Sequence, residues 1–372
     1  MRAALLATGI VIGVALSSAP VASQTVQLRY DASVASGPIT GRAFFFIART
    51  DRSEPRLQAS SSRNSEPFFG IDVEGLRPGQ MATIDATTLG FPVASLKQLP
   101  AGEYYVQGMI LPYTQFTRAD GHTIWAHMDS WEGQRFNNAP GALVSAVQKL
   151  RIDPATNPTI ALSLTTVLPP VATLTDSPWV QRVKMTSKKV SAFWNHDMPI
   201  GAVVLLPNGY AQNPTKRYPV VYTVGHFSER APFGFTFDGC DTPETAQAKA
   251  ARLVRGAREP GCEFQQAWTA GKVPEFIAVF IQHPTPFYDD SYVLNSANNG
   301  PYGDAITQEL IPEIDRRYRT IPSSHARTLT GGSTGGWDVL ALQVHYPDVF
   351  GGAWSLYPDQ LDFRNYQFGN VY

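Results

Sequence analysis

The stretch TLTGGSTGGW, residues Thr328–Trp337, places a serine inside the pattern Gly-x-Ser-x-Gly at the end of an apolar run. The residues Arg327–Thr330 are typical of a short strand, and Trp337–His345 are typical of a helix. A tight turn between such elements holds Ser333 in a strained backbone conformation, in which side chains at the flanking glycines would collide with neighbouring backbone. The pattern therefore predicts an exposed serine nucleophile. The alternative is a Gly/Ser-rich helix start in which Ser333 only caps the helix.

Residues 1–23 have the organisation of a secretory signal peptide. Arg2 precedes the apolar run Ala3–Leu16, and small residues follow as far as Ala22 and Ser23, where cleavage is expected. The apolar run is too short to cross a membrane comfortably, and no cysteine near the cleavage site could carry a lipid anchor. We therefore expect a soluble, exported protein that is periplasmic or secreted.

Composition and charge exclude several classes of partner. The chain has 372 residues, of which 43% are hydrophobic, and its formal net charge is −1. Nucleic acid and anionic membrane surfaces require clustered Lys and Arg side chains, so we expect neither as a partner. The sequence has no His-x-x-x-His or Cys-x-x-Cys spacing, so neither a metal nor another cofactor is expected.

Export makes the cysteines informative, because an oxidising compartment favours their pairing. The only two are Cys240 and Cys262, which flank a charged, Ala-rich segment. Within that segment Thr242–Arg258 is expected to be helical. We predict a disulfide between the two cysteines, and the alternative is a pair of free, buried thiols.

Residues 24–166 alternate short apolar-polar runs with turn residues, as in Val26–Tyr30 and Arg42–Ile47. Period-two runs separated by Gly-Pro, Pro-Gly and Asn-Pro turns are strand signals, so we predict an antiparallel β-sandwich of immunoglobulin-like size. Residues 167–178 contain three prolines and little charge, which indicates an extended linker and a domain boundary.

Residues 179–372 alternate strand-like and helical runs. Unbroken apolar strands between helices predict an α/β domain with a mostly parallel sheet covered on both faces. A helix is expected over Tyr302–Tyr318, with its apolar residues on one face. The expected strands besides the one that ends at Ser333 are Gly201–Leu206, Tyr218–Val224, Phe276–His283 and Phe350–Tyr357.

The region from about Val180 to Asp362 resembles the Putative esterase family of α/β-hydrolases, which includes esterase D, feruloyl esterases and enterochelin esterases. Four segments carry the resemblance in the order expected. They are LPNGY at Leu206–Tyr210, the strand Tyr218–Val224, the helix ELIPEI at Glu309–Ile314 followed by Arg317–Arg319, and the glycine-flanked serine at Gly331–Gly336.

The resemblance implies acyl transfer to serine. Ser333 would attack an ester carbonyl while a histidine held by a carboxylate takes the serine proton. The N–H of Thr334 would bind the oxyanion of the tetrahedral intermediate, together with a second N–H from the loop after Val224. That loop reads Gly-His-Phe where relatives have His-Gly, so the second donor is expected to be Phe227 or His226.

The family order is nucleophile, acid, histidine, and the segment after Ser333 contains only one histidine. His345 lies along the helix that leads away from Ser333, on the order of 15 Å distant, and is rejected as the base. Asp359 or Asp362 could be the acid, because both follow the next strand, although a solvated loop aspartate is as good an interpretation. We therefore expect an incomplete hydrolase domain, cut after its sixth strand, which would be poorly soluble and nearly inactive.

Earlier histidines have other expected roles. His325 precedes the strand of Ser333 and lies at the wrong end of the sheet, whereas His226 and His283 follow strands at the right end. Both could contact substrate, although a structural role is the more common one for such histidines. The loop Pro284–Pro301 should contribute to substrate selection, with Tyr292 as a ring that could stack on substrate or pack the loop.

These observations predict an exported serine esterase that acts on a carboxylic ester of a sugar, an aromatic acid or a siderophore. Two alternatives remain open. One is a non-catalytic protein that binds a ligand or carbohydrate with a degenerate hydrolase domain, for which the missing histidine is the support. The other is an acyltransferase that passes the acyl group to an alcohol in place of water.

Overall fold

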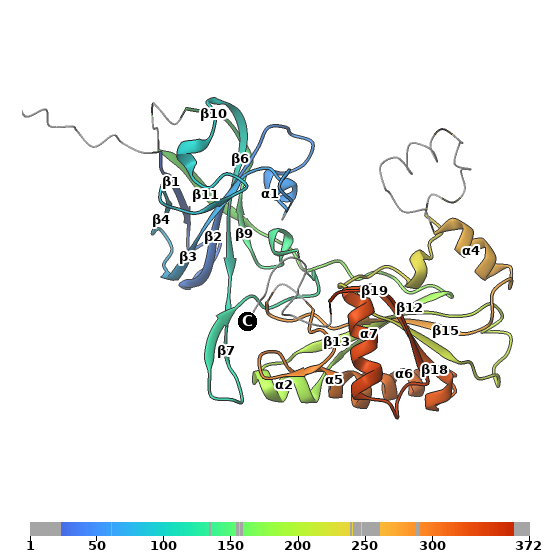
Figure 1. The fold of residues 1–372 in the computed structure, drawn as a ribbon. Coiled ribbons are helices and arrows are strands. Elements are labelled where there is room, and N and C mark those ends of the chain that lie inside the picture. The colour runs from blue at the N-terminus through green and yellow to red at the C-terminus, as the bar shows by residue number, and fades with distance from the viewer. Residues whose placement is uncertain are drawn as a thin grey trace, which may run out of the picture.

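A computed structural model describes residues 24–360, except 61, 134, 154–155, 157–158, 239, 241–246, 248–260 and 288–289. The expected signal peptide, most of the expected helix Thr242–Arg258 and the candidate acid Asp362 lie outside the described residues. The chain forms an N-terminal β domain and a C-terminal α/β domain (Figure 1). None of the helices in the described part of the chain is both long and apolar enough to span a membrane.

The N-terminal domain is built on one nine-stranded sheet with the order β4-β1-β11-β9-β6-β2-β3-β5, in which β10 also pairs with β6. Two short helices, α1 (Pro55–Gln58) and η1 (Leu96–Gln98), lie in its connections. The strands are β1 (Val26–Tyr30), β2 (Ile39–Ala48), β3 (Phe68–Leu76), β4 (Ala82–Ile84), β5 (Gly90–Phe91), β6 (Gly102–Pro112), β9 (Leu143–Ser145), β10 (Gln148–Ile152) and β11 (Ile160–Val167).

The period-two pattern of β2 explains how both faces of this sheet are covered. Phe45 and Ile47 enter the main core, whereas Phe44 and Phe46 belong to a second apolar cluster on the other face. The main core forms because the sheet folds back on itself. A side chain on Gly108 of β6 would come within 2.6 Å of Leu28 on β1, so glycine permits this close approach.

This arrangement differs from the expected antiparallel sandwich in two respects. The strands form one continuous sheet, because β6 pairs with β2 along one edge and with both β9 and β10 along the other. In addition, β1 pairs with β11 in parallel. Period-two runs identify strands but do not fix which strands pair, because pairing depends on contacts between residues distant in the sequence.

A hairpin leaves the N-terminal domain and packs on the C-terminal domain (Figure 1). It consists of β7 (Thr114–Thr117) and β8 (Thr123–Ala126). Phe116 of the hairpin is buried edge-to-face against Trp194, with 5.0 Å between ring centroids. Asn195 Nδ2 donates to the carbonyl oxygen of Thr117 at 2.7 Å. The boundary drawn from composition therefore does not separate the two cores, because this segment contributes to the second one.

The C-terminal domain has a six-stranded sheet with the order β12-β13-β15-β14-β18-β19. Strands β15, β14, β18 and β19 are parallel, and β12 and β13 are antiparallel additions at one edge. The strands are β12 (Val180–Thr186), β13 (Pro199–Leu205), β14 (Val220–Thr223), β15 (Ile277–Gln282), β18 (Arg327–Ser333) and β19 (Gly352–Pro358). The α/β fold class and its mostly parallel sheet are confirmed.

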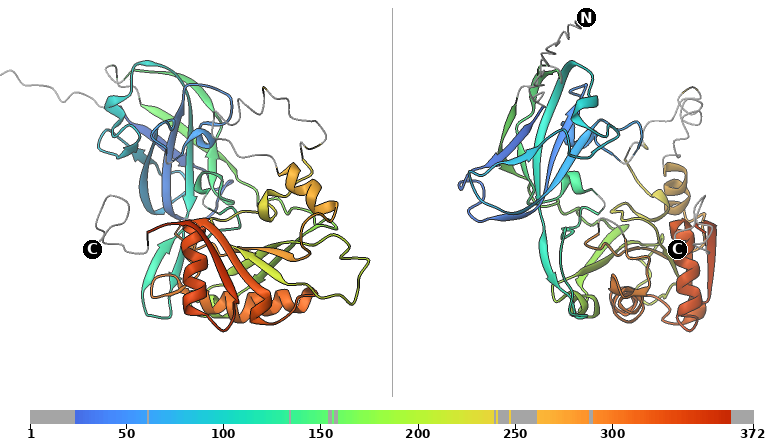
Figure 2. Two further views of the ribbon diagram at one scale, coloured as in Figure 1. Left: turned by 45° about the vertical axis from the view of Figure 1, so that its right-hand side comes forward. Right: turned by 60° about the vertical axis from the view of Figure 1, so that its left-hand side comes forward.

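Alternate residues of the central strands face different layers. Ala202 and Val204 of β13 lie in the large core, while Leu205 lies in a smaller cluster with Trp268 on the other face. The helices that supply the large core are α2 (Lys188–Trp194), α5 (Tyr302–Ala305), η4 (Ile306–Leu310), α6 (Ile311–Arg317) and α7 (Thr334–His345), and α4 (Cys262–Thr269) supplies the smaller one. The two views in Figure 2 agree that the N-terminal sheet stands over one side of this domain.

The expected helix over Tyr302–Tyr318 is present, but its middle part, η4, is a single π-helical stretch. Pro312 follows at the start of α6 and has no N–H to donate to the preceding turn. A widened turn just before a proline accommodates its ring within an otherwise continuous helix. The disulfide prediction is confirmed: Cys240 and Cys262 are bonded and attach the chain to the start of α4.

Candidate active site

Ser333 lies at the junction of β18 and α7, where the strand ends and the helix begins. Its backbone has φ 57° and ψ −125°, a conformation that a residue with a side chain adopts only at an energetic cost of order 1–3 kcal/mol. The side chain is exposed at the carboxyl edge of the parallel strands. Strain of this kind persists where the surrounding structure imposes it, and it fits a serine presented for reaction.

Close packing against the neighbouring strand imposes the turn. A Cβ atom on Gly335 would lie 2.1 Å from the carbonyl oxygen of Val224, which follows β14. A Cβ atom on Gly331 would lie 2.3 Å from the carbonyl oxygen of Gly335. Real Cβ atoms do not approach backbone this closely, so only glycine fits at both positions. The sequence expectation about these glycines agrees with the geometry.

Asp359 contacts the serine directly. Ser333 Oγ donates to Asp359 Oδ1 at 3.1 Å, and Thr334 Oγ1 donates to Asp359 Oδ2 at 2.8 Å. The N–H of Asp359 also donates to the carbonyl oxygen of Ser333 at 3.3 Å. Among the described residues no histidine is hydrogen-bonded to the Ser333 hydroxyl. Asp359 therefore lies where sequence reasoning expected an acid, but it contacts the nucleophile rather than a histidine.

The loop after β14 lies next to the turn that holds Ser333. The N–H of Val224 donates to the carbonyl oxygen of Thr330 at 3.2 Å, which brings the loop 225–228 to this edge. The N–H of Phe227 donates to Asp290 Oδ2 at 2.9 Å. Since a carboxylate already accepts this N–H, the structure disfavours Phe227 as the second oxyanion donor. His226 is the other donor expected from the sequence.

His226 and Asp290 form a histidine–carboxylate pair at the same edge. His226 Nδ1 lies 3.4 Å from Asp290 Oδ2, and the histidine side chain is 54% exposed while that of Asp290 is 3% exposed. An exposed ring beside a buried carboxylate is accessible to a ligand. No sequence motif marks Asp290, apart from its place in the loop Pro284–Pro301, which we expected to contribute to the site.

His283 is not accessible in the same way. Its side chain is completely buried, and its Nδ1 accepts the N–H of Ser291 at 3.1 Å. The expectation that His283 contacts substrate conflicts with this burial, and the contact with Ser291 indicates a role in holding the loop after β15. His325 lies in the turn before β18 and His345 ends α7, so both lie away from Ser333 along their elements.

Tyr292 packs toward the helix that starts at Ser333. Its ring is edge-to-face with that of Trp337, with 5.7 Å between centroids. Its backbone has φ 55°, in the left-handed region. We expected the Tyr292 ring either to stack on substrate or to pack its loop. The structure shows the second role, because the ring packs on the first turn of α7.

Sequence reasoning missed a buried charged cluster that the N-terminal domain contributes behind the loop 225–228. His127 Nε2 and Glu132 Oε1 are 2.5 Å apart, and both side chains are buried. Asp129 is 5% exposed, and burial, reinforced by the charge of Glu132, raises its pKa to about 8. Burial also lowers the pKa of the nearby Lys184. No motif marks these residues, because their proximity results from the contact between domains.

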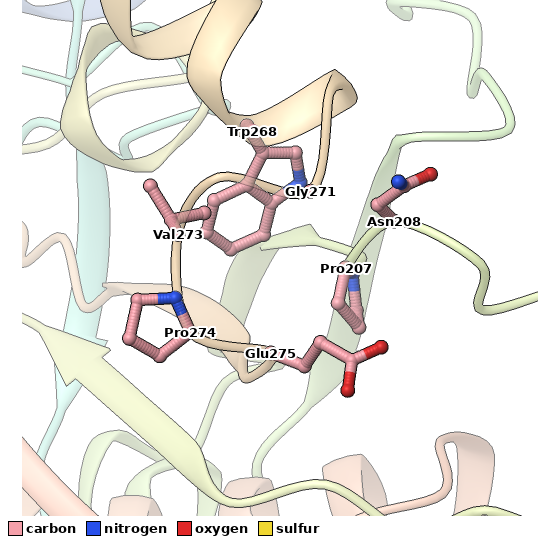
Figure 3. A pocket seen from close by; sticks show the side chains of 7 residues that line it. All are labelled: Pro207, Asn208, Trp268, Gly271, Val273, Pro274 and Glu275. Atoms are coloured by element: carbon pink, nitrogen blue, oxygen red, sulfur yellow. The ribbon is translucent and has the colours of Figure 1, made fainter.

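A pocket of about 250 Å³ lies elsewhere, between α4 and the segment after β13. Figure 3 shows Trp268, Val273 and Pro274 on one side of it and Pro207 on the other. Since Leu205 at the end of β13 pairs with Ala278 at the start of β15, this pocket lies at the amino edge of the parallel strands. Ser333 lies at the carboxyl edge, so the pocket is not part of the serine site.

Comparison with known proteins gives both sequence and structural likenesses. No curated protein matches the chain. Solved structures that match include a ferulic acid esterase, with 19% identity over 48% of this chain and a TM-score of 0.32. Others are a CE1 ferulic acid esterase from Anaeromyces mucronatus, with 17% identity over 51% of this chain and a TM-score of 0.28, and an IroE-like serine hydrolase from Shewanella oneidensis, with 20% over 48% and a TM-score of 0.27.

The chain spans 60%, 63% and 51% of the lengths of these three proteins, respectively. Residues 191–359 match the family model described as Putative esterase. This range begins within α2 and includes every parallel strand described in the C-terminal sheet, Ser333 and Asp359. Residues 191–359 of the chain are therefore similar to the Putative esterase family.

Proposed function

We propose that the protein hydrolyses carboxylic esters through an acyl-serine intermediate formed on Ser333. The observation that carries the proposal is the strained turn of Ser333, with φ 57° and ψ −125°, at the exposed carboxyl edge of the sheet. A residue that only caps a helix does not need such a backbone, because helix-capping serines adopt ordinary extended angles. The Putative esterase match over residues 191–359 supports the same chemistry.

In the proposed reaction Ser333 Oγ attacks the ester carbonyl, and the carbonyl oxygen becomes an oxyanion. The N–H of Thr334 at the start of α7 is one proposed donor to that oxyanion, and the N–H of His226 is the second. The intermediate then collapses, and the alkoxide of the ester leaves as an alcohol after it takes up the proton from the base. Water attacks the acyl-serine, which releases the carboxylic acid and regenerates the Ser333 hydroxyl. If an alcohol takes the place of water, the same intermediate gives acyl transfer.

The proton of Ser333 needs a base. In the family pattern the base is a histidine that follows the acid in the sequence. Asp359, beside Ser333, is the candidate acid. His226 with Asp290 is the alternative at this edge of the sheet. His226→Gln distinguishes the two: if His226 is the base, the variant loses turnover to the same extent as a variant without the serine hydroxyl, and if it is not, turnover persists.

The proposed substrates are small carboxylic esters, such as those of aromatic acids or sugars. His226, with its exposed side chain, is the proposed contact for such a ligand. We also propose that the protein is exported. The leader-like sequence of residues 1–23 and the disulfide between Cys240 and Cys262 support export, because disulfides persist in oxidising compartments.

The test uses the full chain with p-nitrophenyl acetate and methyl ferulate as substrates and a fluorophosphonate as a covalent probe. The unmodified protein should hydrolyse at least one ester and react with the probe. Ser333→Ala should reduce turnover by about 10³-fold or more and abolish labelling. Ser163→Ala, at an exposed position of β11, is the matched control and should behave as the unmodified protein.

Turnover that persists in Ser333→Ala would refute the proposal. Absence of both labelling and turnover in the folded, unmodified protein would also refute it and favour a ligand-binding role for the α/β domain.

A further inference from the structure

The loop 225–228 beside Ser333 is held from two sides. On the side of the C-terminal domain, the N–H of Phe227 donates to Asp290 Oδ2 at 2.9 Å. Gln282, at the end of β15, donates from Nε2 to the carbonyl oxygen of Ser228 at 2.8 Å. A further contact comes from the N-terminal domain.

Trp131 supplies that contact. Its ring meets the Phe227 ring edge-to-face, with 5.2 Å between centroids and 86° between planes. Next to it, a Cβ atom on Gly133 would lie 2.6 Å from Phe227 Cδ1, so the backbone at Gly133 also touches the Phe227 ring. Edge-to-face pairs are favoured by the charge distribution of aromatic rings, and they fix the orientation of both partners.

The C-terminal domain has a site shaped for the Trp131 ring, which is 8% exposed. A Cβ atom on Gly201 of β13 would lie 2.8 Å from the ring, so the glycine makes room for it. Lys184 Nζ on β12 lies 4.4 Å from the ring centroid. A cation over a tryptophan face is attracted to it, which adds to the burial.

The backbone of Trp131 is itself strained, with φ 85°. Its N–H donates to Asp129 Oδ1 at 2.6 Å, which helps to hold this conformation. A bulky residue in the left-handed region is uncommon and persists only where several contacts impose it. The observed strain therefore points to a function for the placement of this ring.

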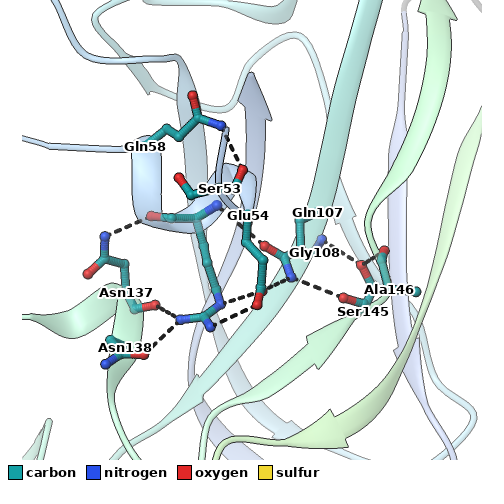
Figure 4. A network of polar contacts seen from close by, with 10 residues as sticks. Ser53, Glu54, Gln58, Gln107, Gly108, Asn137, Asn138, Ser145 and Ala146 are labelled. Atoms are coloured by element: carbon teal, nitrogen blue, oxygen red, sulfur yellow. Dashed lines mark hydrogen bonds and ion pairs between the residues drawn. The ribbon is translucent and has the colours of Figure 1, made fainter. Parts of the chain in front are cut away.

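The N-terminal domain anchors the segment just after Trp131 through a polar network (Figure 4). Arg56 of α1 donates from Nη1 to the carbonyl oxygen of Asn137 at 2.8 Å and to Asn138 Oδ1 at 3.0 Å. Both asparagines lie in η2 (Phe136–Asn138). Gln107 of β6 connects this network to the sheet by donating to Glu54 Oε2 at 2.7 Å.

We propose that Trp131, from the N-terminal domain, is a positioning residue for the loop 225–228 and thereby for the oxyanion donor beside Ser333. The proposal rests on the proposed function. The ring acts through Phe227: it sets where the Phe227 side chain lies, and with it the peptide groups of the loop. A displacement of those groups lowers the stabilisation of the tetrahedral intermediate more than it lowers the binding of the ester.

The kinetic test compares Trp131→Ala with Trp125→Ala in the full chain, using the ester hydrolysed by the unmodified protein. Trp131→Ala should lower kcat by between about 10- and 100-fold, because small misplacements near the reacting centre have effects of this size. KM should change less than about 3-fold, since the lost interaction is with the transition state. Trp125 lies on β8, is 48% exposed and serves as the matched control, so Trp125→Ala should keep normal kinetics.

Rescue separates positioning from a general loss of stability. Trp131→Phe retains a ring for the edge-to-face contact and should recover most of kcat. If Trp131→Ala does not fold, a double-mutant cycle of Trp131→Leu, which removes the ring but keeps apolar volume, with Phe227→Leu replaces it. The effects on kcat/KM should be non-additive, because both changes act on one contact. Additive effects, or normal kcat in folded Trp131→Ala, would overturn the proposal.

Hydrogen–deuterium exchange gives a readout that does not depend on turnover. Amides of the loop 225–228 should exchange faster in Trp131→Ala than in Trp125→Ala, and unchanged exchange would overturn the proposal. If the proposed function itself is wrong, the result differs: the unmodified protein neither hydrolyses ester nor reacts with a fluorophosphonate.

Discussion

The surroundings of Ser333 hold its hydroxyl toward Asp359, at 3.1 Å, as well as straining its backbone. The same carboxylate accepts a hydrogen bond from the Thr334 hydroxyl, and the backbone N–H of Asp359 donates to the carbonyl oxygen of Ser333. Asp359 thus stabilises both ends of the turn. The local pattern of glycines around the serine could be predicted from the sequence, because backbone collisions there depend on adjacent residues. The direct contact with Asp359 could not, since it depends on where β19 ends.

Asp129 should give the stability of the protein a distinct pH dependence. Its pKa is raised from 3.8 to about 8 by burial first and by the charges of Glu132 and Asp290, while Lys184 opposes the shift. Between these values the unfolded carboxyl is ionised and the folded one is neutral, so the folded state binds more protons and stability falls as pH rises. Above about pH 8 both states are ionised and the destabilisation is complete.

Asp129→Asn removes this titration while keeping an oxygen that can accept the N–H of Trp131. We expect the free energy of unfolding to fall less between pH 5 and pH 8 in the variant than in the unmodified protein. Urea denaturation at several pH values measures this difference. Asp348→Asn, at an exposed position after α7, is the control and should keep the unmodified slope. Equal slopes for Asp129→Asn and the unmodified protein would contradict the prediction.

The contact between the Ser333 turn and β14 makes a prediction at the level of secondary-structure elements. Gly335→Ala puts a Cβ atom 2.1 Å from the carbonyl oxygen of Val224, so the first turn of α7 and the end of β14 must separate. Because this moves the Thr334 N–H and the loop 225–228 together, ester turnover should fall by at least about 100-fold.

Gly352→Ala is the matched control for Gly335→Ala. Gly352 starts β19, and nothing lies within 4 Å of the position that its Cβ atom would occupy. Both variants are compared for turnover and fluorophosphonate labelling. If Gly335→Ala reacts as fast as Gly352→Ala, the close packing of the turn on β14 does not matter for the chemistry.

The elements of the C-terminal domain could be predicted better than those of the N-terminal domain. Its expected strands correspond to β13, β14, β15, β18 and β19 because strands buried on both faces leave unbroken apolar runs. The π-helical stretch η4 and helix α2 were not predicted, because a single proline and a helix of seven residues leave weak local signals. In the N-terminal domain the strands could be predicted, but the continuous sheet could not, because it follows from long-range pairing.

At the scale of the whole molecule, the two domains are connected by packing contacts as well as by a linker. The hairpin of β7 and β8 enters the large core of the C-terminal domain, and Trp131 reaches the loop beside Ser333. Contacts between residues so distant in sequence leave no local pattern. The sequence therefore predicted two separate domains, whereas the structure shows contacts between them. The N-terminal domain is thus part of the scaffold of the site.

The exposed edge of the C-terminal sheet gives the last prediction. In the part of the chain that the structure describes, β19 pairs only with β18 and ends the sheet. Trp354 and Leu356 on it are 61% and 48% exposed, and Val344 on the neighbouring α7 is 65% exposed. A strand edge with large apolar side chains favours pairing with a second copy, because both hydrogen bonds and apolar burial are gained.

The double variant Trp354→Lys, Leu356→Lys should therefore weaken self-association by about 10-fold or more, since burial of these two side chains is worth more than 1.4 kcal/mol. Sedimentation velocity over a range of protein concentrations measures the association, and circular dichroism verifies that the variant is folded. The control is Leu89→Lys in the N-terminal domain, where an equally apolar side chain is 76% exposed but does not lie on a strand. Lysine at the edge acts by repulsion between copies as well as by loss of apolar surface, so the effect should diminish at high salt. Association that is unchanged in the double variant, or lowered as much by Leu89→Lys, would show that this edge does not mediate contact between copies.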